Sequence, residues 1–213
     1  MDGSYKTVEI EAPADVLSAN RENTGRLDAI HRFEKTDRVP VVLGTYFRYV
    51  MERRNRRIGD YFSNSETQVI QQLLNHKWVM ENVRDDRVLP EDELVVAPDF
   101  QTVRGGCFPV RVEQSGDELP HTILFIETPE DALKLKLPAP EDNLYGKKII
   151  WFGEMRKITS GISVKLNGRR IKVRTDIKGA GGPFPDAFAL AGENIFAWMY
   201  ERPEAVHRLM RLA

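Results

Sequence analysis

Residues 94–99 read Leu-Val-Val-Ala-Pro-Asp, a short apolar run closed by a proline and an aspartate. A run that is apolar on both faces is typical of a buried strand in a parallel sheet. The stretch before it, 65–83, places Val69, Leu73 and Trp78 on one stripe at helical spacing. We therefore predict a helix over 65–83, capped by Ser63 or Ser65, and then a buried strand at 94–97.

The same order of elements is expected upstream. Residues 20–35 place Leu27, Ile30 and Phe33 at helical spacing, and Pro40 ends that pattern. Residues 39–44, Val-Pro-Val-Val-Leu-Gly, then predict another buried parallel strand. Helix, strand, helix, strand is the order of an α/β protein.

Two hairpins are predicted to decorate this sheet. The first joins 107–112 to 122–126, and the second alternates over 164–173 around Asn167-Gly168, the strongest short hairpin signal. Helices are predicted after Thr128, over 145–159, over 187–199 and over 203–212. Residues 1–20 show no clear period and are expected to form a tail or an irregular cap.

Composition limits the function classes. The 213 residues carry 31 Lys+Arg and 32 Asp+Glu, so no global field attracts the chain to nucleic acid or to a membrane surface. A single cysteine, Cys107, cannot form an internal disulfide, and the four histidines show no metal-ligand spacing. No stretch approaches the roughly 20 apolar residues of a membrane span. We expect a cytoplasmic protein with neither a nucleic-acid nor a membrane partner.

Three stretches together resemble the uroporphyrinogen decarboxylase superfamily, which includes decarboxylases of haem biosynthesis and corrinoid-dependent methyltransferases. They are Thr-Asp-Arg-Val-Pro-Val at 36–41, residues 94–100, and Gly-Gly-Pro-Phe at 181–184 with Arg-Pro-Glu-Ala-Val-His at 202–207. The resemblance implies a (β/α)8 TIM barrel, which needs about 250 residues. We therefore expect 21–213 to be its N-terminal half to two-thirds, truncated at the C-terminus.

The resemblance also indicates site residues. Asp99 ends a strand, where barrel enzymes place functional side chains, and it matches the aspartate that accepts hydrogen bonds from pyrrole nitrogens in the decarboxylases. The alternative is an ordinary turn aspartate. Arg48 and Tyr49 match a substrate-binding stretch, but Thr45 stands where the decarboxylases have a second arginine, and Ala189 stands at their tyrosine. These departures favour the methyltransferase-like branch.

Other candidates flank the glycine-rich turn and follow the first strand. Asp176 and Phe184, on either side of the turn, are expected to bind substrate. A cluster of four arginines is either an anion-binding group for a corrinoid or another acidic ligand, or a solvated helix face. It consists of Arg53, Arg54, Arg56 and Arg57.

The leading hypothesis is the substrate-facing portion of a corrinoid-dependent methyltransferase-like enzyme, inactive alone. The resemblance implies that zinc is bound through a His-x-Cys pair and a later cysteine beyond residue 213, so this chain holds no metal or cofactor itself. Its partner would be a small molecule or a corrinoid protein. The alternatives are a decarboxylating lyase of porphyrin biosynthesis, and a non-catalytic half-barrel that self-associates or joins a complementing C-terminal half.

Overall fold

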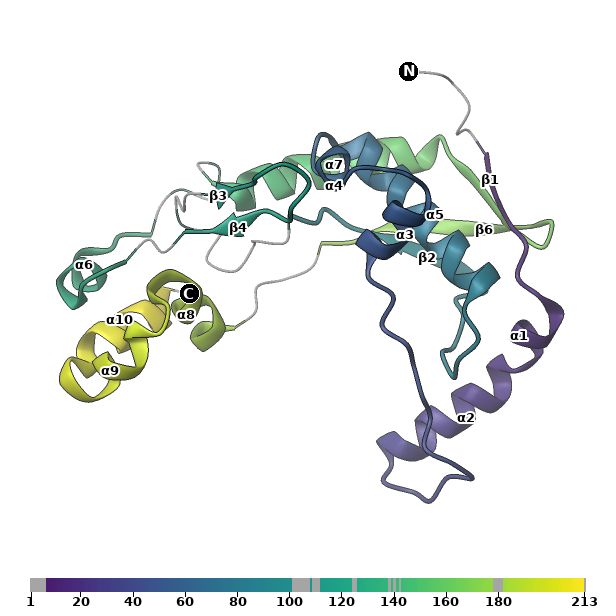
Figure 1. Cartoon of the computed structure of the whole chain (residues 1–213), viewed down its shortest axis with the longest axis horizontal. Coiled ribbons are helices and arrows are strands. Elements are labelled where there is room, and N and C mark those ends of the chain that lie inside the picture. The colour runs from purple at the N-terminus through teal and green to yellow at the C-terminus, as the bar shows by residue number, and fades with distance from the viewer. Residues whose placement is uncertain are drawn as a thin grey trace. The chain divides into compact units, whose positions relative to one another are not determined.

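The computed structural model describes residues 7–100, 108, 112–123, 126–137, 139, 141, 143–177 and 182–212. The chain divides into two compact units (Figure 1). The first unit comprises 1–96 and 155–175, and the second comprises 97–154 and 176–213. The predicted boundary between a tail at 1–20 and a barrel domain at 21–213 stays a prediction.

The first unit contains a four-stranded sheet. Its order is β1 (Thr7–Ile10), β5 (Ser163–Leu166), β6 (Arg169–Thr175) and β2 (Glu93–Val96). β1 runs parallel to β5 and β2 parallel to β6, whereas β5 and β6 form an antiparallel hairpin. Asn167 and Gly168 at its turn have φ of 48° and 78°, the paired positive values of a type I′ turn. The predicted hairpin is confirmed, but it forms the middle of the sheet and not a decoration.

Alternation of side chains gives this sheet one apolar face. Val8, Val164 and Leu94 are buried, while Glu9 and Lys165 lie on the opposite face and form an ion pair of 2.9 Å. The helix α5 (Ser65–Asn82) contacts β1 and β2. The predicted helix is confirmed, but its cap is neither serine: the Oδ1 of Asn64 accepts a hydrogen bond from the Thr67 amide at 2.8 Å.

The N-terminal residues of the described chain form regular elements. β1 is followed by α1 (Ala14–Ser18) and α2 (Asn20–His31). The four residues of β1 are too few to show a period, and their parallel partner β5 lies some 150 residues away in the sequence. The sequence pattern therefore gave no sign of this strand.

The prediction of a buried strand at 39–43 is wrong. These residues form no strand, and Val39 is 79% exposed and Val42 52%. Their backbone is held by a loop: Val41 exchanges hydrogen bonds with Asp86, and the Leu43 amide donates to Asp85. The chain continues into α3 (Phe47–Arg53) and α4 (Ile58–Tyr61).

The buried face of α2 is also different from the predicted one. The apolar stripe ends exposed, with Phe33 98% accessible, and the residues that α2 buries are Asn20, Asn23 and Arg26. Each of these polar side chains bonds to residues between 86 and 91. Helical period located the helix, but it did not identify which face packs.

The second unit is mainly helical. It contains α6 (Pro129–Lys134), α8 (Pro183–Ala191), α9 (Asn194–Glu201), α10 (Pro203–Leu212) and the antiparallel pair β3 (Val112–Glu113) and β4 (His121–Thr122). Thr128 caps α6 as predicted. The single helix predicted over 187–199 is interrupted at Gly192, where φ is 59°. α7 (Leu144–Ser160) contributes residues to both units.

The apolar core of the second unit brings distant parts of the chain together. Phe108 and Ile126 pack with Leu190, Trp198 and Leu209. β3 and β4 confirm part of the first predicted hairpin, while Cys107, 109–111 and 179–181 of the glycine-rich turn lie outside the described residues.

The architecture is mixed α/β. The described strands form one four-stranded and one two-stranded sheet, and a closed barrel is not among them. The (β/α)8 barrel therefore stays a prediction. None of the helices in the described ranges combines the length and the apolar character needed to cross a bilayer.

Candidate functional site

Two predicted carboxylates follow the ends of adjacent parallel strands. β2 and β6 are neighbouring parallel strands (Figure 1). In their register Val96 lies opposite Thr175. Asp99 comes three residues after β2, and Asp176 comes directly after β6. In parallel α/β folds, ligands bind beyond the carboxyl ends of the strands. Both candidate carboxylates therefore follow the carboxyl ends of one parallel strand pair.

Both carboxylates are half-buried. An oxygen of Asp176 accepts a hydrogen bond from the Ile177 amide at 2.9 Å, which orients its carboxylate. Next to Asp99, the ring of Phe100 packs on Trp151 at 4.7 Å. An ionised carboxylate accepts hydrogen bonds only, so this pair can orient N–H or O–H groups of a substrate.

A lysine that sequence reasoning missed lies over the ring of Phe100, the residue that follows Asp99. The ammonium of Lys147 is 5.1 Å from the Phe100 ring centroid and 5.0 Å from that of Trp151. Such cation–π contacts hold the charge over the aromatic faces. The i, i+4 spacing of Lys147 and Trp151 was visible, but the contact with Phe100 requires the fold.

Phe184 packs inside the second unit. It lies near the N-terminus of α8, is partly buried against the core, and its ring is 6.3 Å from that of Phe196. This is a packing position. The predicted substrate contact of Phe184 stays a prediction.

Arg48 and Tyr49 lie on α3 in the first unit. Arg48 forms an ion pair with Glu52 at 2.7 Å, one turn along the helix. The Tyr49 ring meets Trp78 edge-on at 5.3 Å, and Arg53 donates to the Tyr49 hydroxyl at 3.2 Å. These local contacts neutralise or engage the groups proposed to hold substrate.

The predicted arginine cluster does not converge on one point. Arg53 engages Tyr49, whereas Arg54 donates to Gln71 on α5 at 2.9 Å. Arg56 and Arg57 are exposed between α3 and α4. Anion binding by the four guanidinium groups stays a prediction.

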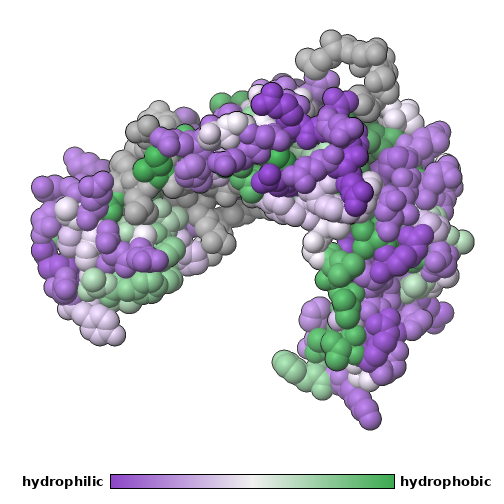
Figure 2. Space-filling model, viewed as in Figure 1, coloured by the Kyte–Doolittle hydropathy of each residue, from purple (hydrophilic) through white to green (hydrophobic). Residues whose placement is uncertain are grey.

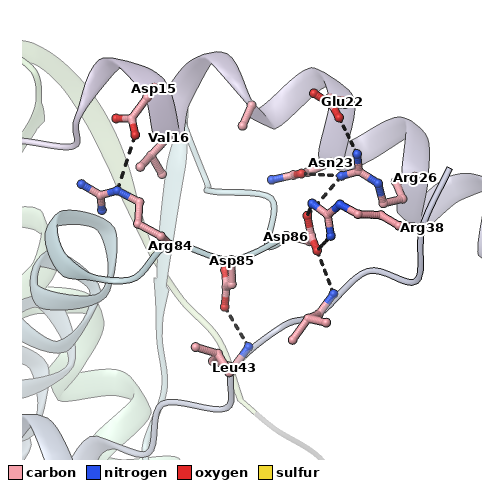
Figure 3. Close-up of a pocket in the computed structure, with 12 residues that line it drawn as sticks. Asp15, Val16, Glu22, Asn23, Arg26, Arg38, Leu43, Arg84, Asp85 and Asp86 are labelled. Carbon is pink, nitrogen blue, oxygen red and sulfur yellow. Dashed lines mark hydrogen bonds and ion pairs between the residues drawn. The ribbon is translucent and has the colours of Figure 1, made fainter.

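The first unit has a charged pocket that the sequence did not reveal. Its volume is about 440 Å³, and α1, α2, the 38–43 segment and the loop 84–86 line it (Figure 3). Arg26 and Asp86 form its inner wall with side chains only 3% and 5% exposed. At its mouth Arg84 lies 3.6 Å from Asp15, a loose surface pair.

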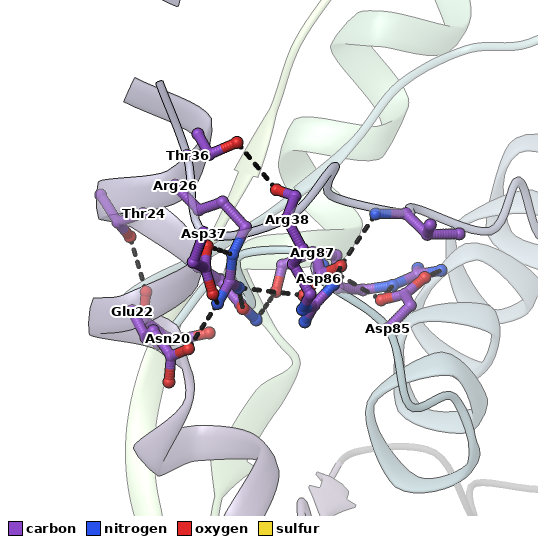
Figure 4. Close-up of polar contacts among 12 residues, drawn as sticks. Asn20, Glu22, Thr24, Arg26, Thr36, Asp37, Arg38, Asp85, Asp86 and Arg87 are labelled. Atoms are coloured by element: carbon purple, nitrogen blue, oxygen red, sulfur yellow. Dashed lines mark hydrogen bonds and ion pairs between the residues drawn. The ribbon is translucent and has the colours of Figure 1, made fainter. Parts of the chain in front are cut away.

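The wall of this pocket is an ion-pair network (Figure 4). Arg38 donates to both oxygens of Asp86, which also accepts from Arg26 at 3.1 Å and from the Val41 amide at 2.8 Å. Arg26 forms a bidentate pair with Asp37 at 2.8 and 2.9 Å. The network fastens the 37–43 segment to α2 and to the loop.

The charges of the network hold its carboxylates ionised. Hydrogen bonds from Arg38 lower the pKa of Asp86 to about 2, and those from Arg26 lower the pKa of Asp37 to about 2. Burial raises the pKa of Asp85, but hydrogen bonds from Arg87 and the Leu43 amide outweigh it and leave that pKa below its usual value. The charged side chains of the network therefore pair with one another, and the network has a structural role.

The described residues hold no candidate metal centre. No group of three or more His, Cys, Asp or Glu side chains there is arranged to hold an ion. His76, on α5, meets the Val95 carbonyl at 3.1 Å. The described residues therefore offer no ligand set for zinc, whose His-x-Cys pair and later cysteine the resemblance places beyond residue 213.

Comparisons with known proteins find a similarity in structure but none in sequence. No family model matches the chain, and no curated protein sequence matches it. A solved structure, a methyltransferase from Methanosarcina mazei, is similar in fold with a TM-score of 0.53 and 16% identity. The match covers 89% of this chain and 51% of that one, so the chain spans about half the length of that protein. At this identity the likeness concerns the fold alone.

Proposed function

We propose that this chain forms the substrate-facing portion of a corrinoid-dependent methyltransferase of the uroporphyrinogen decarboxylase superfamily. The observation that carries the proposal is the placement of Asp99 and Asp176 after the adjacent parallel strands β2 and β6. Support comes from the fold similarity to a methyltransferase and from the three stretches that resemble the superfamily.

The proposed task of the two carboxylates is to orient the substrate. Each can accept more than one hydrogen bond, and a charge-assisted hydrogen bond is about twice as strong as a neutral one. In an intact enzyme, zinc held outside the described residues would activate a thiol, and a corrinoid would donate or accept the methyl group. This chain contributes a fixed acceptor pair at the strand ends.

The decarboxylase alternative also rests on Asp99, but the arginine matched to it is already paired. An acidic tetrapyrrole substrate with many carboxylates requires several free cations. Arg48, the arginine matched to that role, is paired with Glu52, and the second position is Thr45. We therefore retain methyl transfer as the proposed function.

Equilibrium binding of methylcobalamin and of uroporphyrinogen tests the proposal. The wild-type chain is expected to bind methylcobalamin, and Asp99→Asn to weaken that binding about 10-fold or more, the effect of one charge-assisted hydrogen bond. Asp15→Asn, an exposed aspartate of the first unit, is the control and should bind as wild type.

The outcomes separate the two enzyme classes. Binding of uroporphyrinogen that Asp99→Asn abolishes, with no binding of methylcobalamin, would replace the proposal with the decarboxylase. Absence of binding to both compounds would refute a substrate role for the strand-end carboxylates.

A further inference from the structure

The 39–44 segment is an extended chain held along one edge only. The amide and the carbonyl of Val41 both bond to Asp86, at 2.8 and 2.9 Å. Two residues on, the amide of Leu43 donates to Asp85 at 2.8 Å and its carbonyl accepts from Arg87 at 2.7 Å. Polar groups that face the same side at i and i+2 are the pattern of a strand edge. We call residues 39–44 the open edge.

The other side of the open edge has no partner within the described chain. The amide and carbonyl of Val42, the carbonyl of Pro40 and the amide of Gly44 form no hydrogen bond among the described residues. Four apolar side chains along it are exposed: Val39 at 79%, Val41 at 56%, Val42 at 52% and Leu43 at 53%. Figure 2 shows apolar residues gathered between α2 and α3. Such an edge is a template for strand addition.

We propose that two copies of this chain pair through the open edge, antiparallel and centred on Val42. In this register the two Val42 residues exchange two hydrogen bonds, and each Gly44 amide donates to the Pro40 carbonyl of the other copy. Proline lacks an N–H, so only the bonds from Pro40 to Gly44 are missing. The register therefore uses every donor that residues 40, 42 and 44 possess.

Side chains and charges also match in this register. Val41 lies opposite Leu43 of the second copy and Val42 opposite Val42, and pairs of β-branched and apolar residues stabilise adjacent strands. The charged residues at the start of the edge are already neutralised, Asp37 by Arg26 and Arg38 by Asp86. Two copies therefore approach without uncompensated charge.

The size of the contact sets the expected strength. A single short strand edge buries less than the roughly 1,200 Å² of a stable interface. We therefore expect a weak dimer that forms as the protein concentration rises. The proposal is independent of the proposed catalytic function, because it involves neither Asp99 nor Asp176.

Sedimentation equilibrium over a wide concentration range tests the pairing. Val42→Pro keeps an apolar side chain but removes the two Val42–Val42 hydrogen bonds of the four between the copies. A proline at 42 is compatible with the extended backbone of Val41 before it. We expect wild type to dimerise and Val42→Pro to weaken dimerisation at least about 10-fold. Ile150→Asp, at an exposed position of α7, is the control and should dimerise as wild type.

Disulfide trapping tests the register. In a Cys107→Ala background, Val42→Cys should form a disulfide-linked dimer much faster than Gly44→Cys or Ile150→Cys, since position 42 alone faces itself. A wild-type chain that stays monomeric at every concentration would overturn the proposal. Dimers unaffected by Val42→Pro, or equal trapping at the three positions, would overturn it as well.

Discussion

The side chains of Arg26 and Asp86 meet at 3.1 Å although they are 60 residues apart in the sequence, and both are almost wholly excluded from water. A buried guanidinium requires a charged partner, because an unpaired ion in this position would lose its hydration without compensation. The pair thus ties α2 to the loop after α5.

Asp86→Asn is expected to destabilise the first unit strongly. The substitution removes one carboxylate from buried Arg26, which keeps its pairs with Asp37 and Glu22, and it removes the bidentate contact with Arg38. Loss of one partner of a buried pair is costly, so we expect the thermal midpoint to fall by several degrees. Glu34→Gln, which breaks an exposed pair with Arg32, is the control and should shift the midpoint little.

Acid should weaken the chain through the same network. The pKa values of Asp86 and Asp37 in the folded chain are about 2, below the usual 3.8, because Arg38 and Arg26 favour the ionised forms. A lowered pKa gives stability that is complete above about pH 4 and is lost as the pH falls toward 2. Urea denaturation at a series of pH values should show this loss in wild type and a smaller one in Asp86→Asn. Equal pH dependence in the two would contradict the network.

Asn64→Ala is expected to lower the free energy of unfolding by about 1 kcal/mol, the usual value of an N-cap. Its Oδ1 accepts from the Thr67 amide, which has no partner within the helix. Ser18→Ala is the control, since its hydroxyl donates to the Asp15 carbonyl in α1 and does not touch α5. Chemical denaturation distinguishes the two, and an equal effect would refute Asn64 as the cap.

Replacing glycine by alanine should change the free energy of unfolding in opposite directions at two positions. Gly168→Ala places a Cβ at φ 78° in the hairpin turn and should destabilise by about 1 kcal/mol. Gly153→Ala in α7 meets open space and should stabilise by up to about 1 kcal/mol, because alanine favours the helix. Chemical denaturation of both variants, compared with wild type, measures the two changes in the free energy of unfolding.

Local sequence signals predicted the local structure well. The Asn167-Gly168 turn needs positive φ at two consecutive residues, which few sequences provide, so its hairpin was foreseeable. The cap of α6 at Thr128 followed from the same kind of short-range rule. In contrast, β1 has only four residues and is stabilised by a strand near residue 163.

Features that depend on residues far apart in the sequence could not be predicted from local patterns. Leu27, Ile30 and Phe33 suggested an apolar buried face for α2, but Arg26 is buried because Asp37 and Asp86 neutralise it. The apolar character of 39–43 predicted burial, yet the acidic loop, and not neighbouring strands, binds its backbone. Nothing local in the sequence reveals such pairings.

The candidate site was foreseeable in part. Asp99 was identified as a strand-end residue, because a polar residue that follows an apolar run has a known place in parallel folds, and Asp176 was identified by its place beside the glycine-rich turn. That their strands are neighbours required the register of β2 and β6. Lys147 was missed because its aromatic partners come from separate segments.

The most direct test of the central proposal is a double-mutant cycle of methylcobalamin binding with Asp99→Asn, Asp176→Asn and both together. If the two carboxylates orient one ligand, each single substitution weakens binding and the double variant loses less than the sum of the two free-energy changes. Additive effects, or a wild-type chain that does not bind methylcobalamin, would contradict a shared substrate site at the strand ends.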